Sequence, residues 1–246
     1  MQYRGARNMT SDDKLARFAG LLYLILLPTT GLWYGAWRFT MTADAASTLA
    51  RIQTSRTLLE LAIIAGGAGF VDFLIVGLVF YRLFAPAGKD AAALMLALVA
   101  TSVPLSLAAV ARHMDVLSLL DAGRGLPALT GEPLQMQVML VLHSADNLFL
   151  ITNIFSGLWL VPLGWLVFRC GFMPRVLGVL LMLGSVFYVL TFAGTVFDPD
   201  YANTLFGRIV GISSGIPGIL AELGTGLWLL IMGARYRKTA VHPTAA

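Results

Sequence analysis

Two acidic residues lie deep inside hydrophobic stretches of this chain. Asp72 lies ten residues before Arg82, and Glu222 lies 13 residues before Arg235, with mostly apolar residues between. At about 1.5 Å per helical residue, the two carboxyl groups would lie about 15 and 20 Å from the charged ends of their segments. A charged acid at that depth in a hydrocarbon layer costs about 2.5 kcal/mol or more. Each is therefore expected to be partnered, hydrated or protonated, as acids in ion and substrate pathways are.

Two polar residues at a similar expected depth extend this candidate site. We expect Asn153 and Tyr188 to face the bundle interior and to form, with Asp72 and Glu222, a binding site for a small solute or an ion. The alternative is structural. Polar side chains within membrane helices also join helices through hydrogen bonds worth about 0.6 kcal/mol each.

A second group of residues suggests different chemistry. His113 lies at the end of an apolar stretch, and His143 and Asp146 lie one helical turn apart before another. Histidines with carboxylates bind zinc, which activates a water for hydrolysis, and two histidines can ligate haem. No HExxH spacing accompanies them. His113, His143 and Asp146 are thus an alternative metal or haem site, and no other cofactor is expected.

The composition indicates where these residues lie. Of the 246 residues, 58% are hydrophobic and 12% are charged, whereas soluble domains are about 45–50% apolar and about 25% charged. The net charge is +4, but the basic residues lie at the ends of apolar runs and form no patch, so nucleic-acid binding is not expected. The single cysteine, Cys170, excludes an intrachain disulfide. We predict a membrane protein whose main partner is the lipid bilayer.

Six apolar segments reach the roughly 20 residues that a helix needs to cross a bilayer. The predicted spans are residues 15–37, 61–81, 91–111, 148–168, 176–197 and 205–233, between cytoplasmic tails at residues 1–14 and 234–246. Residues 134–147 are expected to form a helix on the outer surface, because residues 134–170 exceed one span, and part of 38–57 is expected to form another. The predicted fold is an all-α, six-helix transmembrane bundle with short interfacial helices on the outer side.

The turn at residues 169–175 sets the predicted orientation. It holds Arg169 and Arg175 in a connection too short to leave the interface, which favours the cytoplasmic side. With that turn inside, both termini are inside as well. Eleven basic residues then lie inside (Arg4, Arg7, Lys14, Arg17, Arg82, Lys89, Arg169, Arg175, Arg235, Arg237 and Lys238) and six lie outside (Arg38, Arg51, Arg56, Arg112, Arg124 and Arg208).

Two further patterns concern packing. Gly207, Gly211 and Gly215 recur every four residues, so they predict a face on which another helix packs closely, inside the bundle or across a homodimer. Trp33, Tyr34 and Trp37 end the first span and are expected to form an aromatic belt at the membrane interface.

Several stretches resemble one bacterial membrane family. They are GWLVFRCGFMPRVLGVLLMLGSVFYVL (164–190), ARFAGLLYLI (16–25), VFYRLFAP (79–86) and ELGTGLWLL (222–230). They are similar to the family catalogued as domain of unknown function 4386, over most of residues 15–235. The distinctive part is residues 169–178, where Cys170 replaces a more usual serine and Phe172 and Met173 replace a usual Tyr-Leu. The resemblance implies a multi-pass membrane protein and supplies no activity.

The sequence thus favours a protein of the bacterial cytoplasmic (inner) membrane. The expected function is transport of a small solute or an ion, coupled to protons, through Asp72 and Glu222. Two alternatives stay open. One is a membrane-embedded enzyme that uses a metal or haem, and the other is a non-catalytic structural or regulatory protein.

Overall fold

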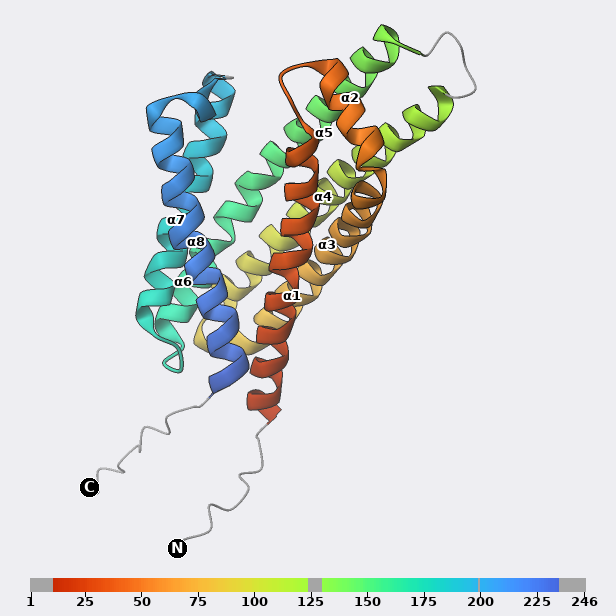
Figure 1. Ribbon diagram of the computed structural model, residues 1–246. Coiled ribbons are helices and arrows are strands. Elements are labelled where there is room, and N and C mark those ends of the chain that lie inside the picture. The colour runs from red at the N-terminus through yellow and green to blue at the C-terminus, as the bar shows by residue number, and fades with distance from the viewer. Residues whose placement is uncertain (1–10, 124–129, 199, 235–246) are drawn as a thin grey trace, which may run out of the picture.

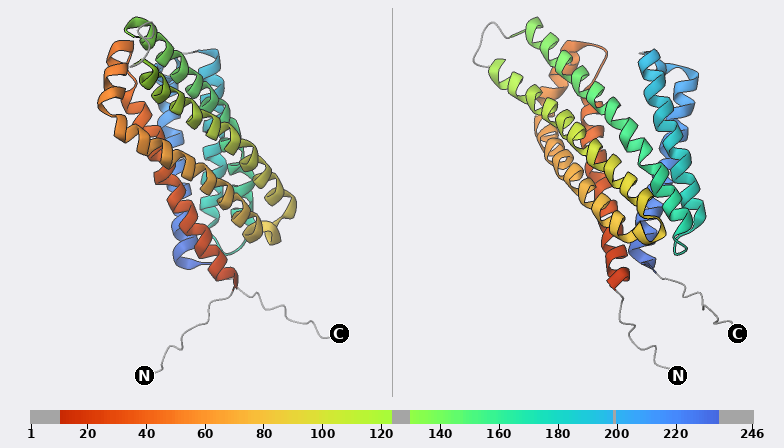
Figure 2. Two further views of the ribbon diagram at one scale, coloured as in Figure 1. Left: turned by 90° about the vertical axis from the view of Figure 1, so that its right-hand side faces the viewer. Right: turned by 180° about the vertical axis from the view of Figure 1, so that it is seen from behind.

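The computed structural model describes residues 11–123, 130–198 and 200–234, and every regular element in those ranges is a helix (Figure 1). The long helices lie side by side in one elongated bundle (Figure 2). In chain order, the elements are α1 (Ser11–Thr40), α2 (Ala45–Thr54), α3 (Arg56–Phe84), η1 (Ala85–Ala87), α4 (Lys89–Gly123), α5 (Glu132–Leu158), α6 (Leu160–Arg169), α7 (Arg175–Phe197), η3 (Tyr201–Asn203) and α8 (Leu205–Met232).

The helices close into a ring. α1 packs on α3, α3 on α4, and α4 on α5 and α6; α7 then packs on α5 and α6, α8 on α7, and α8 returns to α1. The contact between α1 and α8 is very close. A Cβ atom added at Gly20 of α1 would lie 2.5 Å from Leu230 N and 2.6 Å from the Gly226 carbonyl oxygen of α8. The first and the last described helix therefore meet backbone to backbone.

One end of the bundle gathers the start of α1, the end of α8 and the two short turns at η1 and between α6 and α7 (Figure 1). Trp228 Nε1 of α8 donates a hydrogen bond of 2.9 Å to the Phe172 carbonyl oxygen in the α6–α7 turn. Gly171 in that turn has a φ of 74°, in the left-handed region that favours glycine. We call this end the predicted inner end, and the opposite end, with α2 and η3, the predicted outer end.

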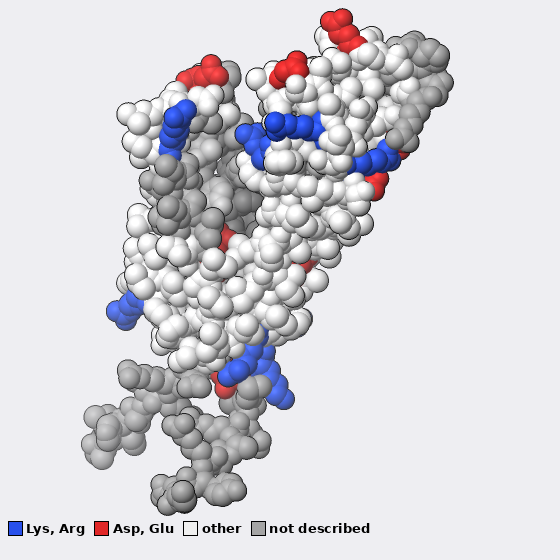
Figure 3. Space-filling view, viewed as in Figure 1, with Lys and Arg blue, Asp and Glu red and all other residues white. Residues whose placement is uncertain are grey.

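The lateral surface of the bundle is apolar. Between its two charged ends, the described face in Figure 3 is an uncharged band in which only small acidic patches are visible. Large hydrophobic side chains lie exposed there, for example Ile64 and Leu140 at 67% each. Five segments are long and apolar enough to cross a membrane: Asp12–Thr40, Arg56–Ala87, Lys89–Gly123, Glu132–Arg169 and Arg175–Phe197. The protein is therefore an all-helical, multi-pass membrane protein.

The sixth span stays a prediction. α8 has 28 residues, which is enough to cross a bilayer. Its described apolar run, Leu220–Met232, is shorter than a full span. The prediction that both termini are cytoplasmic likewise depends on the charge distribution along the sequence.

The prediction of a separate surface helix at residues 134–147 is wrong. These residues are part of α5, which runs without a break from Glu132 to Leu158. α4 also continues 12 residues past the predicted end of its span, and the two helices pack together. Buried residues continue along both extensions, with Leu134 and Val138 on α5 and Val116 and Leu120 on α4. Each helix thus has an apolar face to cover beyond the expected membrane boundary.

The short helix α2 lies at the predicted outer end, as expected for part of residues 38–57. α2 has 10 residues and begins after Asp44, whose Oδ2 accepts a hydrogen bond of 2.7 Å from Ser47 N. This is an N-cap, and the hydrogen bond lowers the pKa of the Asp44 carboxyl. Leu49 and Ile52 are buried and fix α2 to the bundle.

The break between α5 and α6 lies at Trp159, in the bundle interior. Trp159 is 3% exposed. Its ring lies 5.0 Å from Phe73 of α3 and 6.0 Å from Tyr23 of α1, in T-shaped contacts, and Tyr23 also contacts Phe80 at 5.3 Å. Such aromatic pairs each add about 0.5–1.5 kcal/mol beyond their buried area. The predicted fourth span, 148–168, is therefore two helices joined at an aromatic core.

Candidate functional site

Glu222 lies in α8 in the bundle interior. It is partly buried, and it follows the fully buried Ala221. Among the residues that the structure describes, no Lys, Arg or His forms an ion pair with its carboxyl group. An acid that lacks a positive partner in a low-dielectric region has a high cost of ionisation, so its surroundings decide whether it holds a proton.

Two tyrosines from other helices act on Glu222. Tyr23 of α1 and Tyr188 of α7 both interact electrostatically with its carboxyl group. Tyr23 is fully buried, and its hydroxyl has no hydrogen-bond partner of standard geometry in the described chain. From α8, the Glu222 side chain is the group that acts on this hydroxyl.

One more unpartnered hydroxyl lies on the same face of α8. Thr225 is one turn after Glu222, is fully buried, and its Oγ1 has no hydrogen-bond partner among the described residues. Buried hydroxyls normally have partners, and one left free costs about 1–3 kcal/mol. The Glu222 side of α8 therefore has unused hydrogen-bonding capacity.

Tyr188 is positioned by the α5–α6 break. A Cβ atom at Gly157, two residues before Trp159, would collide with the Cβ of Tyr188, so only glycine lets α5 and α7 approach here. Asn153 is one turn earlier on the same face of α5 and is partly buried. Asn153 therefore lies on the side of α5 that faces α7, one turn toward the predicted outer end.

Asp72 does not join this group. The structure records no interaction between its carboxyl group and Glu222. Asp72 follows Gly69 by one turn, and Gly69 packs on Thr29 and Thr30 of α1. Its Oδ2 is buried without a partner in the described chain, while the neighbouring Val71 is half exposed. Asp72 therefore lies at the edge of the α1–α3 contact, and the expected single site that contains both acids stays a prediction.

The two halves of the bundle differ around Glu222. Toward the predicted inner end the helices are tightly packed, with Phe84 stacked on Phe172 at 5.8 Å and the backbone contact of Gly20 with α8. Toward the predicted outer end, α7 and α8 diverge from α1 (Figure 1). No described residue of α7 after Ser185 is buried. Glu222 thus lies between a closed half and a loosely packed half.

The predicted glycine stripe has only a local role where it is described. A Cβ atom at Gly207 would collide with the Tyr201 carbonyl oxygen, so Gly207 packs on the turn before its own helix. Gly211 and Gly215 lie in α8, but their surroundings are outside the described residues. The close contacts of α8 that the structure does describe involve Gly226 with Leu24 of α1 and Gly224 with Leu177 of α7.

His113 is not at a helix end but inside α4, where it is 6% exposed. Its Nδ1 accepts a hydrogen bond of 3.1 Å from Trp33 Nε1, and its ring stacks on Trp37 at 4.0 Å. Both indoles are 2% exposed, so of the expected aromatic belt only Tyr34, at 45%, faces outward. The Trp33 indole N–H has a polar partner in the imidazole, whereas Trp37 Nε1 is buried without a hydrogen-bond partner in the described chain and its ring only stacks on His113.

His113 and Asp146 line one small pocket, and the exposed His143 acts electrostatically on Asp146. The three residues are therefore near one another. Within residues 11–123, 130–198 and 200–234, however, no three His, Cys, Asp or Glu side chains are grouped as metal ligands. The metal and haem hypothesis therefore stays a prediction: Nδ1 of His113 accepts the Trp33 N–H, and only Nε2 is left to act as a ligand.

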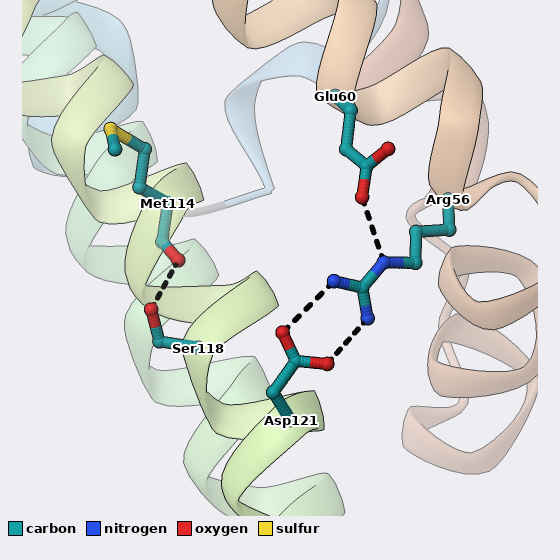
Figure 4. Close-up of polar contacts among 5 residues, drawn as sticks. All are labelled: Arg56, Glu60, Met114, Ser118 and Asp121. Atoms are coloured by element: carbon teal, nitrogen blue, oxygen red, sulfur yellow. Dashed lines mark hydrogen bonds and ion pairs between the residues drawn. The ribbon is translucent and has the colours of Figure 1, made fainter.

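An ion-pair cluster joins two helices at the predicted outer end (Figure 4). Arg56 at the start of α3 donates to both carboxylate oxygens of Asp121 in α4, at 2.7 and 2.9 Å, and to Glu60 Oε1 at 2.8 Å. This bidentate geometry fixes α3 to α4. Its role is structural, since it satisfies all three charged groups.

Sequence reasoning missed Tyr23 and the inward direction of His113. A tyrosine within an apolar helix resembles an ordinary core residue. The available signal was its depth, since Tyr23 lies 12 residues into α1, too far for its hydroxyl to reach water at either interface. A hydroxyl at that depth indicates a polar partner on another helix.

Comparison with known proteins gives the family of the chain and nothing about its activity. No curated protein and no solved structure matches it. One family model matches residues 18–233, which include all the helices that surround Glu222. The chain therefore belongs to the family described as Domain of unknown function (DUF4386).

Proposed function

We propose that the protein carries a small solute across the bacterial inner membrane in exchange for, or together with, a proton, and that Glu222 is the proton-binding group. The observation that supports this most strongly is the environment of Glu222. Its carboxyl group lies in the helix bundle beside the hydroxyl groups of Tyr23 and Tyr188, with no positive partner in the described chain. Such an acid changes its protonation when its hydration changes.

The shape of the bundle supports an access route from one side. Secondary transporters place their sites near the membrane midplane beside interrupted helices. Here the α5–α6 break at Trp159 and Gly157 positions Tyr188, and the outer half of α7 is loosely packed. In this proposal Glu222 is reached from the outer side, and the aromatic contacts of Tyr23 close the inner side. Movement of α7 and α8 toward α1 would then reverse the access.

The test uses the purified full chain in liposomes that contain a pH-sensitive dye. Because the proposed transport is coupled, a mixture of small organic acids, amines and sugars is supplied on both sides of the membrane. An imposed pH gradient should then collapse faster with the wild type than in protein-free liposomes. Glu222→Gln keeps the size of the side chain and removes its titration, so its rate should fall to the protein-free level. Glu132→Gln is the matched control, because Glu132 is exposed at the start of α5.

Two results would reject the proposal. One is a wild-type rate equal to that of protein-free liposomes, and the other is a folded Glu222→Gln protein with the wild-type rate. The structural alternative predicts the second result together with a change in melting temperature. Thermal unfolding of each variant in detergent therefore accompanies the flux measurement.

A further inference from the structure

A small pocket near the predicted outer end lies apart from Glu222. We call it the indole pocket. Its lining combines four aromatic rings, a histidine and two opposite charges: Trp33, Tyr34, Trp37, Arg38, His113, Ala145, Asp146 and Phe149. The enclosed space is about the size of one water molecule. The pocket joins α1, α4 and α5, and no step proposed for Glu222 involves it.

His113 presents one fixed hydrogen-bond donor in this pocket. Since Nδ1 accepts the Trp33 N–H, the neutral imidazole carries its proton on Nε2. The Trp37 ring, stacked at an interplanar angle of 12°, holds the imidazole in place. No described residue accepts a hydrogen bond from Nε2–H. The pocket therefore contains a preorganised donor that is not used within the described chain.

Arg38 and Asp146 form a weak ion pair at the same place. Their closest atoms, Nη1 and Oδ2, are 3.8 Å apart, with no hydrogen bond between them, and the side chains are 54% and 39% exposed. Pairs of this kind contribute about 0–1 kcal/mol, so they separate easily. Because both residues line the pocket and both are half exposed, they lie at its mouth. A ligand that brings its own two charges can replace this contact with two better ones.

We propose that the indole pocket binds a zwitterion that carries a primary ammonium group and a phosphate, as a phosphatidylethanolamine headgroup does. The phosphate accepts hydrogen bonds from the Arg38 guanidinium and the His113 Nε2–H, and the ammonium group lies against the Asp146 carboxylate and the aromatic rings. The small enclosed space admits –NH₃⁺, which is about as large as water, and excludes trimethylammonium. The pocket lies where the first span meets the outer interface, the depth of a lipid headgroup.

Native mass spectrometry of the full chain in detergent tests this proposal. The probes are phosphatidylethanolamine, phosphatidylcholine and phosphatidylglycerol, and soluble phosphoethanolamine is the competitor. We expect the wild type to retain phosphatidylethanolamine about tenfold more strongly than the other two lipids. Asp146→Asn should abolish the preference over phosphatidylglycerol, and Arg38→Gln should weaken the binding of both about tenfold.

The matched controls are Asp115→Asn and Arg112→Gln. These two residues form a 3.1 Å ion pair on α4, at the same end of the bundle and outside the pocket, and are equally exposed. Both controls should keep the wild-type lipid preference. Competition by phosphoethanolamine at similar concentrations would identify a free zwitterion as the ligand, and its failure to compete would identify the lipid.

Equal retention of the three lipids by the wild type would overturn the proposal. So would wild-type behaviour of Asp146→Asn and Arg38→Gln. If phosphatidylglycerol binds best, the site recognises only the negative charge of the headgroup, and the role of Asp146 is rejected. Melting temperatures of the four variants establish that each protein tested is folded.

Discussion

Trp33 Nε1 donates a 3.1 Å hydrogen bond to His113 Nδ1, and this bond joins α1 to α4 in a buried site. Trp33→Phe removes the donor and leaves Nδ1 without a partner, which costs about 1–3 kcal/mol. We therefore expect a clearly lower melting temperature in detergent. Tyr34→Phe is the control, since that side chain faces outward and should leave the melting temperature unchanged. An equal effect of the two changes would argue against a stabilising role for the bond.

The backbone contact between α1 and α8 predicts a strong glycine requirement. Gly20→Ala puts a methyl group 2.5 Å from Leu230 N, so the two helices must separate or the protein must lose stability by about 1–3 kcal/mol. Gly31→Ala, on the same helix, meets nothing within 4 Å and should be neutral or slightly stabilising. Thermal unfolding of both variants, measured side by side, checks the difference.

Tyr23 carries two roles that one substitution separates. Tyr23→Phe keeps the ring contacts with Phe80 and Trp159 and removes the hydroxyl beside Glu222. Under the proposed function, the proton flux in liposomes should change while the melting temperature stays near the wild-type value. A large loss of stability with unchanged flux would assign the hydroxyl to packing alone.

The Arg56–Asp121 pair should make a small, salt-dependent contribution. Its groups are partly exposed, so Asp121→Asn is expected to cost about 0.5–1 kcal/mol at low salt and less at high salt. Asp115→Asn breaks a pair within α4 only and should cost less, because it joins no second helix. Urea unfolding at two salt concentrations measures how much each substitution lowers the free energy of unfolding. A salt-independent loss would show that Asp121 acts through packing.

Cys170 gives a test of orientation and of burial. Burial raises the pKa of its thiol, so less thiolate is present at a given pH and alkylation is slower than for an exposed cysteine. Cys170→Ser combined with Lys89→Cys supplies the exposed comparison at the same end of the bundle. In both proteins the alkylation rate should rise with pH. For Cys170 this rise should occur at a higher pH than for the cysteine introduced by Lys89→Cys.

The same pair of proteins reports which side faces the cytoplasm. A membrane-impermeant maleimide should label the Lys89→Cys protein in inverted vesicles and spare it in intact spheroplasts. Labelling in intact spheroplasts alone would place both short turns outside and reverse the predicted topology.

Depth along a helix could be predicted from this sequence, but direction around a helix could not. Counting from Arg235 put Glu222 inside the membrane, and the structure has it in the interior. The same count from Arg82 put Asp72 at a similar depth, yet it lies at the edge of the α1–α3 contact, because its direction depends on which helices flank α3. Which helices flank α3 depends on how all the helices close into a ring, and no local pattern of residues in the sequence encodes that arrangement.

The extension of α4 and α5 was missed for a different physical reason. Bilayer thickness limits how long a lipid-facing apolar stretch needs to be, about 20 residues. It sets no limit on a helix whose apolar face packs on another helix. Leu134 and Leu142 are buried in protein beyond the expected membrane boundary, so bilayer thickness alone did not predict where α5 begins. His113 was misplaced by the same assumption.

The meeting of α1 with α8 has a consequence for biosynthesis. Gly20 lies on the face of α1 that packs on α8, and α8 leaves the ribosome after every other described helix. During synthesis, α1 must wait in the bilayer with that face against lipid. Ring closure is therefore a late step of assembly, and a nascent chain stalled before α8 leaves the backbone at Gly20 without its helix partner.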